Sequence, residues 1–247
     1  MIDTDVVLPA FELAVQDIHG LSVAARLPVD RIELCAALAV GGLTPSLGLV
    51  EAAAGTPGIP PVHVLVRPRP GGFDYDAEEC DLIVRDVRHV LSAGAHGVVI
   101  GGVRGDRIDT DLLKRIIEEA GGADVTFHRA FDTLPDPASA LDLLATSGVR
   151  RVLTSAGADA VGHALPALAS LVRAAAGGIE IMAGGGVHPE LVPDLVATGV
   201  AAIHASAKRT VADTVTVGLG TAAPAGAPTR ETTDEAQVER ILAALGR

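Results

Sequence analysis

The sequence contains little sulfur and few aromatic rings. Its 247 residues include two cysteines, two methionines, four phenylalanines, one tyrosine and no tryptophan. Two cysteines are too few for a disulfide framework or a four-thiolate metal site. The scarcity of aromatic side chains leaves few surfaces on which single-stranded nucleic acid could stack.

Positive charge is also in short supply. The chain has 19 Lys and Arg residues against 31 Asp and Glu residues, a formal net charge of −12. Binding to nucleic acid or to an anionic membrane surface needs a basic face, so the acidic balance argues against both. We therefore expect no nucleic-acid partner and no membrane partner.

Long apolar runs are missing as well. No stretch approaches about 18 uninterrupted apolar residues, the length that a spanning helix needs. Residues 1–10 include Asp3 and Asp5 and lack the basic region and apolar run of a secretory signal. We expect a cytoplasmic protein, and its hydrophobic fraction of 49% is enough for a sizeable core.

The sequence does contain a regular alternation of strand and helix patterns. Four helical patterns end at glycine or begin at capping residues, over residues 77–94, 136–148, 189–199 and 233–245. Eight runs rich in strand-forming residues recur at intervals of roughly 20 to 35 residues, the size of one βα unit. They are 11–15, 31–35, 62–66, 97–101, 124–128, 151–155, 179–182 and 201–205.

Eight such units in about 250 residues are what a (β/α)8 barrel requires. A doubly wound open sheet is the alternative, but it usually has fewer strands and no final helix after an eighth. No composition shift divides the chain, so we predict an α/β fold, a single-domain TIM barrel over residues 1–247. Residues 211–229, rich in Thr, Gly, Ala and Pro, are interpreted as a long flexible loop before the last helix. The alternative for this segment is an insertion without function.

Two glutamates occupy strand positions that a barrel interior normally fills with apolar side chains. Glu12 and Glu33 each share a face with small residues, while the bulkier apolar residues of their strands share the other. Both are therefore predicted to point into the barrel from adjacent strands. Since buried charges cost several kcal/mol unless paired, we expect them to pair with Arg67 or a histidine.

Further polar residues follow the third and fifth predicted strands. Barrel enzymes keep their chemistry at this C-terminal end of the strands. One interpretation is an ion-pair network that closes the core. The other is a site where a carboxylate or a histidine moves a proton while an arginine holds an anionic or carbonyl group. It makes catalytic candidates of Glu12, Glu33, Arg67, His128, Arg129 and Asp132.

The residues that end the last two predicted strands suggest a second site, one for an anion. Loops after the seventh and eighth strands of such barrels often bind phosphate through backbone N–H groups, and glycine allows close approach. The candidates for anion binding are Gly184, Gly185, Gly186 and Ser206. A tight turn before the helix at Pro189 is the alternative explanation of the glycines.

The two cysteines differ in their predicted surroundings. Cys80 lies on the apolar face of its helix and is interpreted as a core thiol. Cys35 ends the second strand on the interior side, where it could be a metal ligand or a reactive thiol. Cu(I) needs soft ligands, usually two or more, and neither a CxxC nor an MxxM spacing exists. The residues alone do not favour a dedicated copper site.

Six sequence runs, in order along residues 11 to 206, resemble the CutC family: 30–35 (DRIELC), 41–46 (GGLTPS), 67–69 (RPR), 126–132 (TFHRAFD), 151–155 (RVLTS) and 181–184 (IMAG). The resemblance implies a TIM-barrel protein of the cytoplasm, a homodimer or higher oligomer, with a role in copper homeostasis and copper binding. Cys35 matches the family's second-strand cysteine. Where family members often carry a first-strand cysteine, this sequence has Ala14 and Val15. The six catalytic candidates match the family's residues.

Three functions therefore remain open. The first is copper handling, with the metal held by Cys35 and helped by His128, His204 or a glutamate. The second is an enzyme that acts on a small anionic or phosphorylated metabolite by proton transfer or hydrolysis. In it Glu12 or Glu33 is the base, His128 is the acid, and Arg67 with the glycine loop holds the anion. The third is a sensor that binds the same molecule without turnover.

Overall fold

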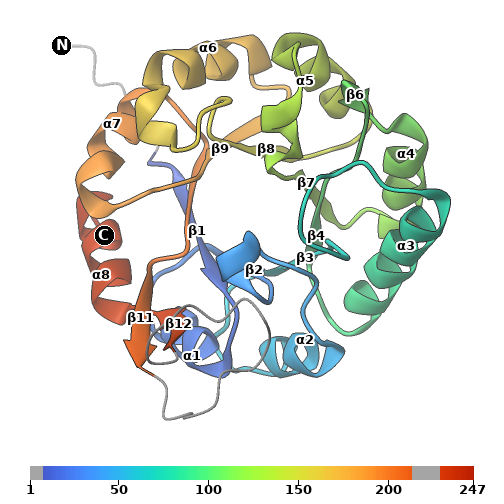
Figure 1. The fold of residues 1–247 in the computed structure, drawn as a ribbon. Coiled ribbons are helices and arrows are strands. Elements are labelled where there is room, and N and C mark those ends of the chain that lie inside the picture. The colour runs from blue at the N-terminus through green and yellow to red at the C-terminus, as the bar shows by residue number, and fades with distance from the viewer. Residues whose placement is uncertain (1–7, 213–228) are drawn as a thin grey trace.

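The computed structural model describes residues 8–212 and 229–247, and its centre is a closed barrel of eight parallel strands (Figure 1). The closure excludes the doubly wound sheet and confirms the predicted TIM barrel. Each predicted strand run overlaps one strand of the barrel. In order around the barrel these are β1 (Ala10–Val15), β2 (Arg31–Leu34), β3 (Val62–Leu65), β4 (Gly97–Ile100), β7 (Asp124–Phe127), β8 (Arg151–Thr154), β9 (Glu180–Ala183) and β10 (Ala202–Ala205).

Helices surround the barrel and cover the outer face of its strands (Figure 1). Aspartates cap several of them: Asp17, Asp109 and Asp136 each accept a hydrogen bond from a backbone N–H of the first turn, and Asp76 forms a capping box with Glu79. The helices are α1 (Ile18–Arg26), α2 (Leu47–Ala54), α3 (Ala77–Ser92), α4 (Thr110–Ala120), α5 (Pro137–Thr146), α6 (Leu165–Ala175), α7 (Val192–Ala197) and α8 (Glu235–Ala244). In the described part of the chain, none is long and apolar enough to cross a membrane.

The main core lies between the strands and the helices. Outward-facing residues such as Leu13, Ile32 and Phe127 are buried there. Inside the barrel the apolar residues form two small clusters, one of Cys35, Leu65 and Val99 and another of Leu153, Met182 and Ala202. Polar and charged side chains such as Glu12, Glu33 and His63 occupy much of the remaining interior.

Glycines on neighbouring strands make room for the interior histidines. His63 of β3 lies against Gly97 of β4, and a Cβ at Gly97 would stand 3.1 Å from the His63 ring. The ring of His128, just after β7, packs so closely on Gly101 that no side chain would fit there. A Cβ added at residue 184, just after β9, would stand 3.3 Å from the Cβ of His204.

Short elements follow several strands at the C-terminal end of the barrel. The 3-10 helices are η1 (Leu38–Val40), η2 (Arg129–Thr133), η3 (Val161–His163) and η4 (Pro189–Leu191), so the helix predicted over residues 189–199 is divided into η4 and α7. β5 (Val103–Arg104) pairs with β6 (Arg107–Ile108). β11 (Lys208–Ala212) pairs antiparallel with β12 (Thr229–Thr233).

The hairpin of β11 and β12 includes both ends of the loop predicted over residues 211–229. Residues 211, 212 and 229 belong to the paired strands. Residues 213–228 lie outside the described part of the structure, so the predicted loop is described only at its two ends. Because β12 leads directly into α8, the hairpin stands between the last barrel strand and the last helix.

Candidate active site

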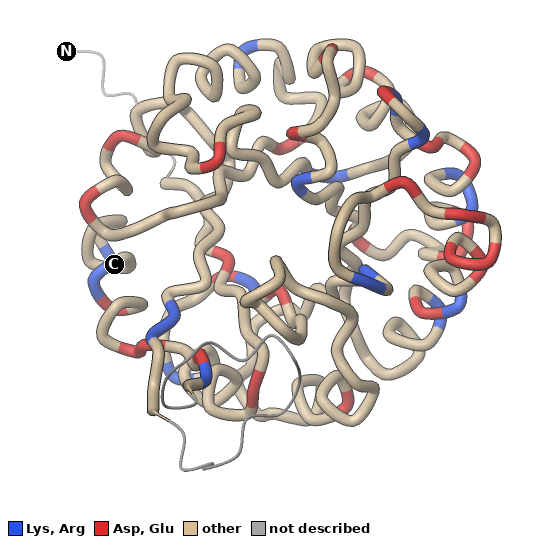
Figure 2. The backbone as a smooth tube through the Cα atoms, in the orientation of Figure 1, with Lys and Arg blue, Asp and Glu red and all other residues tan. Residues whose placement is uncertain are grey.

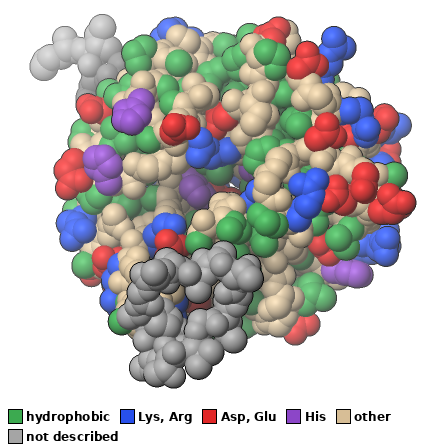
Figure 3. Space-filling model, in the orientation of Figure 1, with side chains coloured by type: hydrophobic (Ala, Val, Ile, Leu, Met, Phe, Trp, Pro, Cys, Tyr) green, Lys and Arg blue, Asp and Glu red, His purple; other side chains and the backbone are tan. Residues whose placement is uncertain are grey.

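A pocket of about 480 Å³ opens at the C-terminal ends of the barrel strands. Figure 3 shows this face hollowed near its middle, with a histidine side chain at the wall of the hollow. Charged residues of both signs lie on the inner ring of strands as well as on the outer helices (Figure 2). The charged and imidazole side chains that line the pocket are Glu33, Arg67, His128, Arg129, Asp132, His204 and Lys208.

A second hollow, at the opposite end of the barrel, offers a contrast. It has a volume of about 520 Å³, and its charged lining residues are paired: Arg150 lies 3.6 Å from Asp124 and 3.2 Å from Glu180. The buried Arg151 adds a bond of 3.1 Å to Thr126 and ion pairs with the same two carboxylates. These charges satisfy one another, which is typical of a stabilising network.

Glu12 is fully buried inside the barrel and fully paired. β10 and β2 flank its strand β1 and bring His204 and Arg31 level with it in register. Its carboxylate accepts from Arg31 Nε at 2.5 Å and from His204 Nδ1 at 2.8 Å. Burial alone would raise the pKa of Glu12, but the hydrogen bond from His204 and the charge of Arg31 outweigh it and hold that pKa well below 4.5. Glu12 is therefore a fixed negative charge.

Glu33 is the unpaired member of the two interior glutamates. It is 5% exposed, lines the pocket, and receives no hydrogen bond from a described residue. Burial raises its pKa to about 7; the charge of His204 opposes this rise and that of Glu12 adds to it. Glu33 therefore changes its protonation state near neutral pH.

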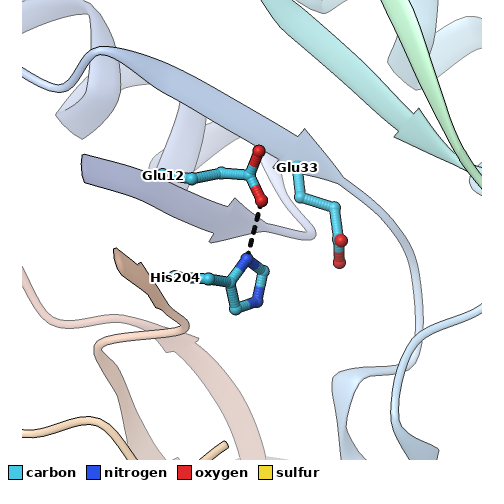
Figure 4. A group of neighbouring side chains, drawn as sticks. All are labelled: Glu12, Glu33 and His204. Carbon is cyan, nitrogen blue, oxygen red and sulfur yellow. Dashed lines mark hydrogen bonds and ion pairs between the residues drawn. The ribbon is translucent and has the colours of Figure 1, made fainter. Parts of the chain in front are cut away.

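His204 joins the two glutamates into one cluster. The side chains converge from β1, β2 and β10, and one donor atom of each lies within 4.8 Å of the others (Figure 4). Burial lowers the pKa of His204, but the charges of Glu33 and Glu12 and the bond to Glu12 outweigh it and raise that pKa above 6.5. The cluster thus combines a fixed carboxylate, an imidazole whose protonated form is favoured, and a titrating carboxyl group.

Arg67 binds backbone carbonyl groups. Its guanidinium donates to the carbonyl oxygens of Val40 at 3.0 Å, Gly42 at 2.9 Å and Gly71 at 2.7 Å, and it stacks over Phe73 at 5.3 Å. These bonds tie together the loops that follow β2 and β3. The sequence predicts that the glutamates pair with Arg67 or a histidine. Glu12 pairs with the histidine His204, and also with Arg31. Arg67 forms no ion pair with either glutamate.

His128 is held as a neutral ring. Its Nδ1 accepts a hydrogen bond of 3.1 Å from the N–H of Ala130, which places the ring proton on Nε2. Burial, together with the charge of Arg67, lowers the pKa of His128 to about 3. At ordinary pH the side chain is therefore an uncharged N–H donor and carries no ionisable acidic proton.

Asp132 and Arg129 brace the loop after β8. Asp132 accepts from Arg129 Nε at 2.8 Å, from Ser155 Oγ at 2.9 Å, from the amide N–H of Gly157 at 3.2 Å and from Thr154 Oγ1. Arg129 Nη2 also donates to Ser155 Oγ at 2.6 Å. The Nη1 atom of Arg129 donates to no described acceptor. It lies close to Gly185, since a Cβ added to that glycine would be 3.1 Å away from it.

The predicted anion-binding residues divide into two groups. Gly185, Gly186 and Ser206 line the pocket, and the first two have φ angles of +99° and +73°. The amide N–H groups of Gly185 and Gly186 donate to no acceptor within the described ranges. Gly184 is not a lining residue, and its role is to leave space for Leu153 and His204.

Among the charged and imidazole residues of the pocket, sequence reasoning missed Lys208 and named His204 only as a helper in metal binding. His204 shares its strand face with Ser206, which was the available signal for it. Lys208 begins β11, lines the pocket and donates to Glu231 at 2.9 Å. No sequence pattern distinguishes this lysine, because the fold alone brings β11 to the pocket rim.

Strained backbone marks the same face. Ala37, Ala156 and Ala207 have φ angles of +53°, +57° and +38° and follow β2, β8 and β10. Left-handed conformations are uncommon for residues with a Cβ and gather at functional sites. Their position at the C-terminal ends of three strands supports placing the site there.

The donor atoms present do not fit a Cu(I) ion. Cys35 is fully buried, its Sγ lies 3.6 Å from the carbonyl oxygen of Val15, and burial raises the pKa of its thiol well above 9. Among the described residues, the group that could hold a metal is Glu12, Glu33 and His204, which offers oxygen and nitrogen. Cu(I) prefers sulfur ligands.

Comparison with known proteins gives the chain its family. The family model described as "CutC family" matches residues 10–209. The CutC family protein of Sinorhizobium medicae is 40% identical over 238 residues, 95% of each chain, and that of Agrobacterium fabrum is 45% identical over 197 residues, 79% of this chain and 78% of the relative. The crystal structure of a CutC protein from Streptococcus agalactiae superposes with a TM-score of 0.75 at 30% identity, over 81% of this chain and 99% of that one. The chain therefore belongs to the CutC family.

Proposed function

We propose that the pocket is the active site of an enzyme that moves a proton on a small anionic molecule, with Glu33 as the group that takes up and releases the proton. The observation that carries the proposal is Glu33 itself, buried at the pocket, unpaired, and with a pKa of about 7. A general base works best when its pKa is near the working pH. Perturbed carboxyl groups of this kind gather at active sites.

The neighbours of Glu33 have supporting roles in this proposal. His204, held by Glu12 with its protonated form favoured, lies beside Glu33 and stabilises its ionised form. Arg31 neutralises the negative charge of Glu12 through its ion pair with that carboxylate. Because both partners are fixed on barrel strands, the carboxyl group of Glu33 is positioned without mobile parts.

The anionic part of the molecule would bind at the ends of β9 and β10. Arg129 Nη1 and the amide N–H groups of Gly185 and Gly186 have no described acceptor there. Lys208 adds a positive charge at the rim of the same pocket. Backbone N–H groups and a guanidinium are the donors that bind phosphate and carboxylate.

A ligand screen followed by turnover assays tests the proposal. Small phosphorylated and carboxylated compounds are screened for stabilisation of the wild type, and the compounds that bind are followed by NMR for conversion. We expect Glu33→Gln to lose at least about 100-fold in rate while staying folded, a typical loss for a general base. The exposed Glu51→Gln on α2 is the control. Equal turnover by Glu33→Gln and the wild type contradicts the proposal.

Copper handling is the second candidate, favoured by the family. The streptococcal relative is named as a candidate copper homeostasis protein. Anaerobic titration of the reduced protein with Cu(I) against a competing chelator tests it, with Cys35→Ala as the variant and Cys80→Ala as the matched buried control. A one-to-one site lost only in Cys35→Ala supports copper binding. The poor fit of the donor set leads us to expect no binding beyond the chelator.

A further inference from the structure

We infer that His128 and Arg67 form a carbonyl-binding subsite in this pocket, so that the proton moved by Glu33 comes from the carbon next to a carbonyl group. The inference rests on the proposed function of the same pocket and narrows its substrate to phosphorylated ketones and aldehydes. The buried N–H of His128, which lacks an acceptor, and the charge of Arg67, which lacks a counter-ion among the described residues, carry it.

The ring of His128 leaves one donor unused. Its Nδ1–Cε1 edge packs on Gly101, and Nδ1 accepts from Ala130, so Nε2–H is its remaining polar group. The residue lines the pocket and is 6% exposed, and Nε2 has no partner among the described residues. The ring of Phe73, 4.8 Å away between centroids, holds the imidazole on another side. A buried donor without an acceptor is costly, and a ligand oxygen would satisfy it.

Arg67 brings a positive charge to the same pocket. Its terminal nitrogens are fixed by three backbone carbonyls, and the buried hydroxyl of Tyr75 lies beside its guanidinium. No carboxylate of the described residues forms an ion pair with it. This guanidinium is therefore a positive charge held in place without a counter-ion, which favours an oxygen that becomes negative.

These two groups suit an oxygen whose negative charge increases during the reaction. A neutral imidazole can donate a hydrogen bond to the carbonyl oxygen and keep its proton as that oxygen becomes negative. It thereby polarises the carbonyl group without protonating it. The carboxylate of Glu33 removes the proton from the carbon next to the carbonyl. The C–H electron pair becomes a carbon–carbon double bond, and the carbonyl π pair moves to the oxygen. The Glu33 carboxylic acid then returns the proton to the same carbon, which gives epimerisation. Return of the proton to the former carbonyl carbon gives isomerisation, provided that the proton of the neighbouring hydroxyl passes to the former carbonyl oxygen as that hydroxyl becomes the new carbonyl. Neither outcome needs a redox partner.

The three parts of the pocket define the substrate class. The amides of Gly185 and Gly186 with Arg129 bind a phosphate, His128 binds a carbonyl oxygen, and Glu33 meets the carbon between them. A volume of about 480 Å³ suits a small ligand. The substrate is therefore a short phosphorylated ketone or aldehyde.

Two probe compounds separate the subsites. Dihydroxyacetone phosphate has a phosphate and a ketone, while glycerol 3-phosphate has the same phosphate and a hydroxyl in place of the ketone. Calorimetry should show roughly tenfold tighter binding of the ketone by the wild type, the upper range for one net hydrogen bond. His128→Phe should abolish this preference and keep the binding of glycerol 3-phosphate. His128→Gln, which restores an N–H donor, should recover part of it, and the exposed His89→Gln is the control.

Proton transfer is followed on the same ketone. In deuterated water, proton NMR should show the wild type exchanging the hydrogens next to the carbonyl, and Glu33→Gln and His128→Phe should lose this exchange. Equal binding of the two probes by the wild type, or full exchange by His128→Phe, overturns the inference and leaves the proposed anion site standing. If neither probe binds, the inference fails, and the wider ligand screen decides the proposed function separately.

Discussion

We expect Glu33→Gln to raise the free energy of unfolding, relative to the wild type, more at alkaline pH than at acid pH. The wild-type carboxyl group is buried with a pKa of about 7, against 4.5 for an ordinary glutamate. Between these two values the folded state keeps the proton that the unfolded state has released. The free energy of unfolding of the wild type therefore falls as pH rises from 4.5 to 7.

The size of the effect follows from the same two values. One pKa unit corresponds to roughly 1.4 kcal/mol, so the ionisation of Glu33 costs up to about 3 kcal/mol. Glutamine has no charge to desolvate and escapes this cost. The attraction between Glu33 and His204 is already contained in the pKa of about 7, so it is not subtracted again. The expected difference between variant and wild type thus increases by about 1 to 3 kcal/mol from acid to alkaline pH.

Urea unfolding followed by far-UV circular dichroism, at about pH 5 and about pH 9, measures this difference. The exposed Glu51→Gln serves as the matched control and should show no change with pH. Carbon-13 NMR of the glutamate side chains gives the pKa of Glu33 directly. A difference that is constant with pH, or a measured pKa near 4.5, would refute the reasoning about Glu33.

Three further substitutions test the surroundings of the pocket. Glu12→Gln should lower the free energy of urea unfolding at neutral pH by about 3 to 5 kcal/mol, because it strands two buried basic partners. Since the pKa of Glu12 is lowered, this loss should shrink as pH falls below 4.5, and a loss that grows in acid speaks against the pairing. Arg67→Met should raise the pKa of His128, measured by NMR titration, and cost about 3 kcal/mol through three orphaned carbonyls; an unchanged pKa contradicts the proposed proximity. Gly101→Ala should displace the His128 ring and cost about 1 to 3 kcal/mol by overpacking, and an unchanged melting temperature would show that the ring has room.

The fold could be predicted from the sequence because its signals are local and repeated. Eight apolar runs at the spacing of βα units leave little choice of architecture, and alternation along single strands correctly placed Glu12 and Glu33 inside the barrel. The helix start at Asp136 followed from its capping chemistry. These features depend only on neighbours in the sequence.

The pairing inside the barrel could not be predicted in the same way. Whether Glu12 meets Arg31 or Arg67 depends on the register between strands and on the closure that brings β10 beside β1. Arg67 donates instead to backbone carbonyls of the loops after β2 and β3, whose positions depend on the whole fold. The difference between Glu12 and Glu33, one fixed and one titrating, arises from these contacts and leaves no trace in either strand's own sequence.

The contact of each interior histidine with a glycine of the neighbouring strand has an evolutionary consequence. At His63 and Gly97, and again at His128 and Gly101, two strands share the space of a single large side chain. A mutation that enlarges the glycine position is tolerated only if the histidine position shrinks. Across related sequences these positions should therefore change as pairs, and relatives that have lost the histidine are those in which the glycine is free to vary.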